Sequence, residues 1–99
     1  MSFLSSGSIV VADTVTLLAS ATTTRSAIEI ANNETSATLY IGGDAALQAG
    51  WGLPVKAGTI FTDSGTNVYY GAWYGITSSG SCDARVAEWY LTQINGVKS

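Results

Sequence analysis

The sequence predicts an all-β protein, a small antiparallel β-sandwich of about seven or eight short strands, for which a jelly roll is one possible form. Ala27, Glu29 and Ala31 alternate with Ile28 and Ile30, which is the period of two of a strand with one buried face, and residues 82–94 form the longest strand candidate. Turn-forming residues recur about every eight to twelve positions, and no segment sustains a helical period. These observations together favour short paired strands around one core.

Four strands are expected in the first half of the chain, over residues 8–11, 14–19, 25–31 and 38–41. The first two are apolar runs separated by Ala12-Asp13. The third ends at Asn32-Asn33, which is a turn signal. Because the fourth begins soon after that signal, it is expected to pair with the third as its antiparallel neighbour.

The second half is expected to begin irregularly and to end in long strands. Glycines and Pro54 interrupt residues 45–58, so at most a single helical turn is expected there. Further strands are predicted over residues 59–63, 68–77 and 82–94, with turns between them. The last strand has two candidate inner faces. One consists of Cys82, Ala84, Val86, Glu88 and Tyr90, and the other of Asp83, Arg85, Ala87, Trp89 and Leu91.

Length and charge restrict the organisation and the partners. A chain of 99 residues with 46% hydrophobic content can form one core, so residues 8–99 are expected to be a single domain. Residues 1–7 are mostly small and polar and are expected to be a flexible or docking N-terminal arm. The net charge of -3 and the scattered basic residues disfavour nucleic acid as a partner. Since only 11% of residues are charged, strand edges are weakly protected, which favours self-assembly or docking on a larger body.

The sequence offers little metal, redox or targeting chemistry. Cys82 is the only cysteine and there is no histidine, so no internal disulfide or zinc site is expected, and we predict no cofactor. The N-terminal residues lack the features of a signal peptide, and no window approaches 18 apolar residues. We therefore expect a protein that is made in the cytosol and does not bind a membrane.

Acidic residues offer a catalytic hypothesis, but simpler roles account for them. Asp44, Asp63, Asp83 and Glu88 lie on or near predicted strands, where a glycosidase-like pair could form. However, Asp44 and Asp63 adjoin turns, in which an aspartate accepts backbone N–H groups. Asp83 is expected to form a surface ion pair with Arg85 on the same strand face. We therefore predict that the protein is not an enzyme.

Aromatic residues are the stronger indication of function. In the predicted strand 68–77, Tyr69 and Trp73 share one face, while Tyr74 and Ile76 share the other. If Tyr74 and Ile76 face the core, Trp73 is exposed and can stack on a sugar or on another subunit. The alternative is that the tryptophans fill the core. The candidate interaction residues are Phe3, Leu4, Trp51, Tyr69, Trp73 and Trp89.

A series of short motifs extends over roughly two-thirds of the chain, from Arg25 to Trp89. The motifs are Ile28-Glu29-Ile30-Ala31-Asn32, Leu39-Tyr40-Ile41-Gly42-Gly43, Gly52-Leu53-Pro54-Val55-Lys56-Ala57-Gly58, Trp73-Tyr74-Gly75-Ile76, Ser79-Gly80 and Asp83-Ala84-Arg85-Val86-Ala87-Glu88. This pattern resembles a group of small β-rich proteins encoded in the virion gene clusters of tailed phages. It contains no catalytic signature.

The resemblance implies a structural virion protein, such as a capsid decoration or cement protein or a head or tail accessory module. Such a protein is made in the cytoplasm of the host bacterium and binds the major capsid protein or another virion protein. By analogy it is a homo-oligomer, with a trimer favoured. The alternative that we keep is a carbohydrate-binding module of a phage fibre, tail or head appendage, which presents Trp51, Tyr69 and Trp73 to host glycan.

Overall fold

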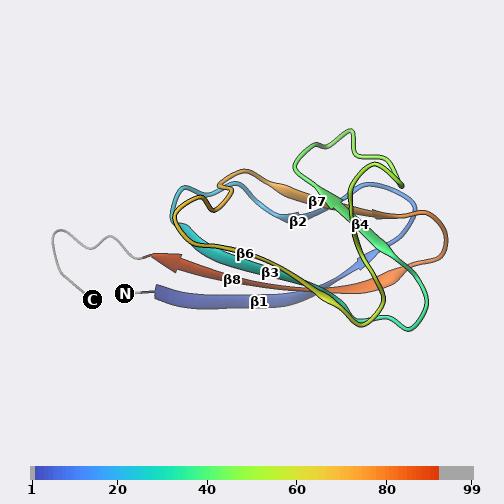
Figure 1. The fold of residues 1–99 in the computed structure, drawn as a ribbon, viewed down its shortest axis with the longest axis horizontal. Coiled ribbons are helices and arrows are strands. Elements are labelled where there is room, and N and C mark those ends of the chain that lie inside the picture. The colour runs from blue at the N-terminus through green and yellow to red at the C-terminus, as the bar shows by residue number, and fades with distance from the viewer. Residues whose placement is uncertain (1, 92–99) are drawn as a thin grey trace, which may run out of the picture.

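The computed structural model describes residues 2–91, and the side chains of residues 6–90, as an all-β sandwich without a helix in that range (Figure 1). The fold class predicted from the sequence is therefore confirmed. The eight strands are β1 (Ser2–Val11), β2 (Thr16–Ala19), β3 (Arg25–Asn32), β4 (Leu39–Gly42), β5 (Leu53–Val55), β6 (Ile60–Ser64), β7 (Trp73–Thr77) and β8 (Cys82–Leu91).

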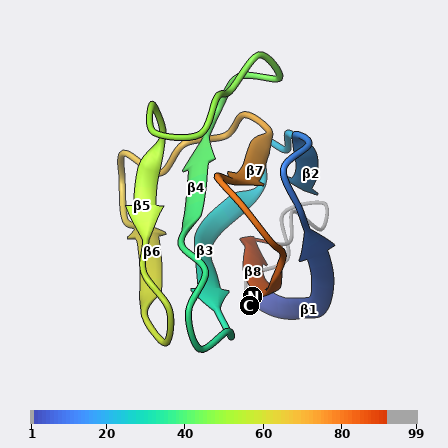
Figure 2. The same ribbon diagram turned by 90° about the vertical axis from the view of Figure 1, so that its right-hand side faces the viewer.

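Two antiparallel sheets of four strands each form the two layers (Figure 2). Sheet A has the order β1-β8-β3-β6, and sheet B has the order β2-β7-β4-β5. The pairs β1–β8, β2–β7, β3–β6 and β4–β5 follow one another like the arms of one long hairpin whose tip lies between β4 and β5. The pairs β3–β8 and β4–β7 close the two sheets. This rolled-up hairpin is the jelly-roll arrangement.

Several local expectations need correction. The strand at 38–41 exists as β4, but it lies in sheet B and does not pair with β3, because residues 33–38 cross from one layer to the other. Residues 53–55, expected to be irregular, form the short strand β5. The strand expected over 68–77 begins only at Trp73. Residues 2–7, expected to be an arm, lie in β1 and pair with β8.

The core lies between the inner faces of the two sheets. On β8 the inner face is the one that contains Cys82, Ala84, Val86 and Glu88, all of which are buried. Sheet B contributes buried side chains that include Trp73, which is only 7% exposed. The exposed position considered for Trp73 is therefore wrong, because β7 turns Trp73 inward and Tyr74 outward.

Polar side chains secure the chain where it leaves the strands. Asn32 is fully buried at the end of β3, and its Nδ2 donates to the carbonyl oxygens of Ala37 and Val55, at 2.8 Å each. The amide thus ties the crossover to β5. At the other tight connection, Gly80 adopts a φ of 71°, which favours glycine, and its carbonyl accepts a hydrogen bond from Thr77 Oγ1.

Candidate functional site

A buried arginine connects the two sheets at the end of the sandwich where β3 begins. Arg25 is 1% exposed, and its Nε donates to Glu88 Oε2 on β8 at 2.8 Å. Its Nη1 donates to the carbonyls of Tyr69 and Gly71, just before β7, and its Nη2 donates to the carbonyl of Ser20, just after β2. Because a buried charge is costly unless it is paired and hydrogen-bonded, this side chain fixes the loop that positions Tyr69.

The other oxygen of Glu88 accepts a hydrogen bond from the hydroxyl of Tyr90 at 2.6 Å. Burial, followed by this contact with the Glu88 carboxylate, raises the pKa of Tyr90 to about 12. Glu88 therefore has two donors, Arg25 and Tyr90, and serves in a structural network.

An aromatic groove lies beside the tip of the rolled-up hairpin. Its volume is about 530 Å³, and its lining includes Trp51, Leu53, Tyr69 and Trp73. Trp73 is the buried member, and its ring meets that of Tyr69 edge-on at 5.4 Å. Trp51 is 76% exposed, and Tyr69 is also exposed. The groove therefore exposes the rings of Trp51 and Tyr69, with Trp73 packed behind Tyr69.

Glycine allows Tyr69 to sit close to the backbone of this groove. A Cβ added at Gly43 would lie 2.7 Å from Tyr69 Oη, so a side chain there would displace the ring. The Arg25 contacts position the loop, and the missing side chain at Gly43 leaves room for the ring, whose hydroxyl donates to the Gly43 carbonyl at 3.4 Å.

The remaining predicted interaction residues, Trp89, Phe3 and Leu4, belong to β8 and β1 of sheet A. Trp89 is half-buried on the outward side of β8. The backbones of Phe3 and Leu4 pair with Tyr90 and Trp89 in the β1–β8 ladder, but their side chains lie outside the described side chains. The structure thus brings Trp51, Tyr69 and Trp73 together and places Trp89 elsewhere.

The outward surface of sheet B, called face B, is apolar and uncharged. The strand register places two rows of residues on this surface. Leu17, Tyr74 and Gly42 stand side by side across β2, β7 and β4, and Ile76, Tyr40 and Pro54 stand side by side across β7, β4 and β5. Leu17 is 46% exposed, whereas Ile76 is buried although it lies outside the main core. None of these outward strand positions carries a charge, so face B can be covered without burying an ion.

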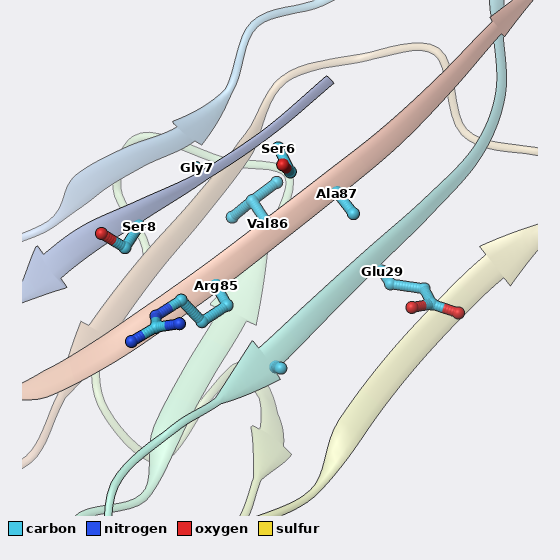
Figure 3. A pocket seen from close by; sticks show the side chains of 8 residues that line it. Ser6, Gly7, Ser8, Glu29, Arg85, Val86 and Ala87 are labelled. Atoms are coloured by element: carbon cyan, nitrogen blue, oxygen red, sulfur yellow. The ribbon is translucent and has the colours of Figure 1, made fainter. Parts of the chain in front are cut away.

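The outward surface of sheet A, called face A, combines small side chains with opposite charges (Figure 3). A shallow depression of about 360 Å³ is lined by small residues of β1, β3 and β8 together with Glu29 and Arg85. A second depression, of about 350 Å³, adjoins it on the Trp89 side and shares Glu29. Face A is therefore a shallowly hollowed surface with charged groups near its centre.

The acidic residues considered for catalysis have separate structural partners. Asp44 Oδ1 accepts the backbone N–H of Ala46, and Asp63 Oδ2 accepts that of Tyr69, as their turn positions predicted. Asp83 forms the predicted ion pair with Arg85, with Oδ2 2.7 Å from Nη2. Hydrogen bonds from Arg85 and Asn33 hold the pKa of Asp83 below its usual value.

Cys82 and the other potential metal ligands complete the survey of chemical groups. Burial, together with the nearby Glu34 and Asp83 carboxylates, raises the pKa of the Cys82 thiol. Within residues 2–91 there is no cluster of three or more metal-ligating side chains and no helix long and apolar enough to cross a membrane.

Sequence reasoning missed the role of Arg25 and the existence of face B. Arg25 and Glu88 are 63 positions apart, and only the pairing of β3 with β8 brings them together. One signal for the arginine was available, since Arg25 lies two positions before the alternation at residues 27–31. Comparison with known proteins does not assign the chain to a family. No family model matches it, and the search of curated proteins found no match.

Proposed function

We propose that this chain is a structural protein of a phage particle that binds the major capsid protein or another virion protein and stabilises the capsid lattice as a decoration protein does. It acts by adhesion, through protein–protein contacts repeated over the lattice. The sequence motifs described above support the virion context, and the structure supplies a surface suited to such contacts.

The single observation that favours this function most is the uncharged character of face B. Tyr40, Tyr74 and Leu17 present aromatic and aliphatic surface, and no outward strand position of sheet B is charged. The cores of protein interfaces are depleted in charge and enriched in tyrosine and other aromatic residues. Face B therefore has the composition of an interface core.

The rigid jelly roll is compatible with this use. Burying face B on a shell would link this chain to the subunits beneath it, and the binding free energy would oppose their separation. The fold class does not by itself decide the function, because jelly rolls occur in viral capsid proteins and in lectins alike.

The test is co-sedimentation with empty capsids assembled from the major capsid protein of the same virion gene cluster. The wild-type chain is expected to pellet with the shells in a saturable manner. Tyr74→Glu and Leu17→Glu place a charge on face B, and each is expected to weaken binding by about 10- to 100-fold. Thr66→Glu makes the same charge change in an exposed turn and is expected to bind as the wild type does.

The outcome that would contradict the proposal is equally concrete. If the folded wild-type chain stays in the supernatant at every shell concentration, it does not act on capsids. If both face B variants bind as well as Thr66→Glu, then the chain docks through another surface.

A second candidate function rests on the aromatic groove. Trp51 is highly exposed beside Tyr69, and an exposed aromatic ring can stack on the apolar face of a sugar. This arrangement favours a carbohydrate-binding module that recognises host glycan. Its platform consists of Trp51 and Tyr69, since Trp73 lies in the core.

Glycan binding is tested by titrating the tryptophan fluorescence with the sugars that a glycan array identifies. Binding at the groove predicts a saturable change in emission that Trp51→Ala abolishes. Trp89 lies on the other sheet, so Trp89→Phe serves as the matched control and is expected to retain the response. An array without any signal would contradict this second function.

A further inference from the structure

The two charged groups near the centre of face A have unequal partners. Arg85 uses Nε and Nη2 to bind Asp83, which leaves Nη1 without a hydrogen bond to any described residue. Glu29 is half-buried on the adjacent strand β3, and its carboxylate has no hydrogen bond or ion pair within the described part of the chain. Figure 3 shows Glu29 and Arg85 on opposite sides of the depression.

The strand register places Arg85 and Glu29 next to each other on adjacent strands. Arg85 stands opposite Ala31, and Glu29 stands opposite Ala87, so the charged residues are diagonal neighbours on β8 and β3. Both are on the two central strands of sheet A. A two-fold axis lying in the plane of the face, and passing midway between them, would set Arg85 of one copy against Glu29 of the other, twice over.

We propose that face A binds the same face of a second copy of this chain, forming a symmetric dimer held in register by two reciprocal Arg85–Glu29 pairs. This inference goes beyond the proposed docking on a shell, because it uses the opposite surface of the sandwich and requires no virion protein. It also names a surface for self-association, which the sequence left open, and it proposes a two-fold dimer where the resemblance favours a trimer.

The side chains around the charged pair allow close approach. Small residues occupy most of the outward positions between the central charges and the edges of the sheet. They are Ser6, Ser8, Ala27, Ala31, Thr62, Ser64 and Ala87. Larger side chains stand further out: Val10 is 73% exposed, Ile60 is 61% exposed, and Trp89 is half-buried on β8 beside the second depression. A second copy would cover these exposed groups, and the Arg85 and Glu29 side chains of the two copies would meet over the shallow depressions at the centre of the face.

The size of face A is compatible with a specific dimer. Four strands about 4.8 Å apart, with about seven residues of each at about 3.3 Å per residue, form a plane of roughly 20 by 23 Å. This planar area is roughly 450 Å² per copy, and the protruding side chains add to it. Two copies therefore bury roughly 1,000 Å² in total, which is near the lower limit for a specific interface and predicts a weak, reversible dimer.

The test is a charge-swap series measured by sedimentation equilibrium of the purified chain. Arg85→Glu and Glu29→Arg each set like charges against one another twice, so each is expected to raise the dissociation constant of the dimer by at least about tenfold. The double variant Arg85→Glu/Glu29→Arg restores opposite charges across the two-fold axis. It is expected to return the dissociation constant to within about threefold of the wild-type value.

Matched controls distinguish an effect of charge on face A from an effect of the net charge of the protein. Lys56→Glu changes the charge as Arg85→Glu does, and Asp13→Arg changes it as Glu29→Arg does, both at exposed positions outside the sheet A strands. Neither is expected to alter dimerisation. Circular dichroism verifies that every variant is folded, and Ala87→Gln, which adds bulk without charge to the centre of face A, is expected to weaken the dimer.

The proposal is overturned if the wild-type chain is monomeric at millimolar concentration. It is also overturned if the single charge variants associate as the wild type does, which would place self-association elsewhere, for example at the edge of β1. A double variant no better than the singles would contradict the reciprocal pairing. None of these results depends on capsid binding, so this inference and the proposed function can fail separately.

Discussion

The two outer faces of the sandwich differ in a way that separates their expected partners. Face A has small side chains and opposite charges near its centre, whereas face B has large apolar and aromatic side chains and no charge at its outward strand positions. Opposite charges on one face can be satisfied by a symmetric copy, since the two-fold axis supplies both partners. An uncharged aromatic face instead suits a partner with its own apolar surface.

Both faces depend on the hydrogen bonds of Arg25, called the Arg25 network. They join Glu88 of sheet A to the segments that flank β2 and β7. Arg25→Ala would leave Glu88 buried without its cation, so we expect the free energy of unfolding to fall by about 3–5 kcal/mol. Urea denaturation measures this loss. Because Arg25 ties sheet A to the segments beside β2 and β7, we expect the proposed binding by both faces to weaken together.

Removing both charges is the control for that experiment. Arg25→Met/Glu88→Leu eliminates the unpaired carboxylate and is expected to recover part of the lost stability. The arginine also binds three carbonyl groups, so the recovery is expected to be incomplete. A single variant as stable as the wild type would show that the network does not hold the sheets together.

Alkaline pH tests the hydrogen bond from Tyr90 to Glu88, which belongs to the same network, without a substitution in the Arg25–Glu88 pair. The pKa of Tyr90 is raised to about 12, so the folded state retains the phenolic proton after the unfolded chain has lost it at about pH 10. The free energy of unfolding is therefore at its full value below pH 10 and falls as the pH rises from about 10 to 12. Tyr90→Phe, compared by urea denaturation across this range, is expected to show a smaller decline.

A matched pair of lysine substitutions distinguishes the two faces directly. Leu17→Lys on face B is expected to weaken capsid binding and leave dimerisation unchanged. Ile60→Lys lies at the margin of face A, where most interface residues contribute little, and is expected to raise the dimer dissociation constant by less than about fivefold. If each variant weakened capsid binding and dimerisation equally, the assignment of capsid binding to face B and of dimerisation to face A would be wrong.

The sequence predicted the parts of the fold that local alternation determines. The strands β3 and β8 were visible because buried and outward residues alternate along them. The neighbour of β4 was not, because alternation does not specify which sheet a strand joins, and residues 33–38 suffice to cross between layers. Residues 68–72 looked like a strand, but two of their carbonyls bind Arg25.

The candidate site was predictable only in part. Exposed aromatic residues were expected from composition, and Trp51 and Tyr69 indeed line one groove. The placement of Trp73 depended on which side of β7 faces the core, and a strand with large apolar residues on both sides leaves that choice open. Face B could not be foreseen, because its residues come from four strands whose order is fixed only by the complete jelly roll.

The most direct test of the central claim is the binding isotherm of this chain on empty capsids, measured side by side for the wild type, Tyr74→Glu and Thr66→Glu. The account predicts saturable binding for the wild type and for Thr66→Glu, with an affinity about 10- to 100-fold lower for Tyr74→Glu. Equal binding by all three folded proteins, or no binding by any of them, would contradict adhesion through face B.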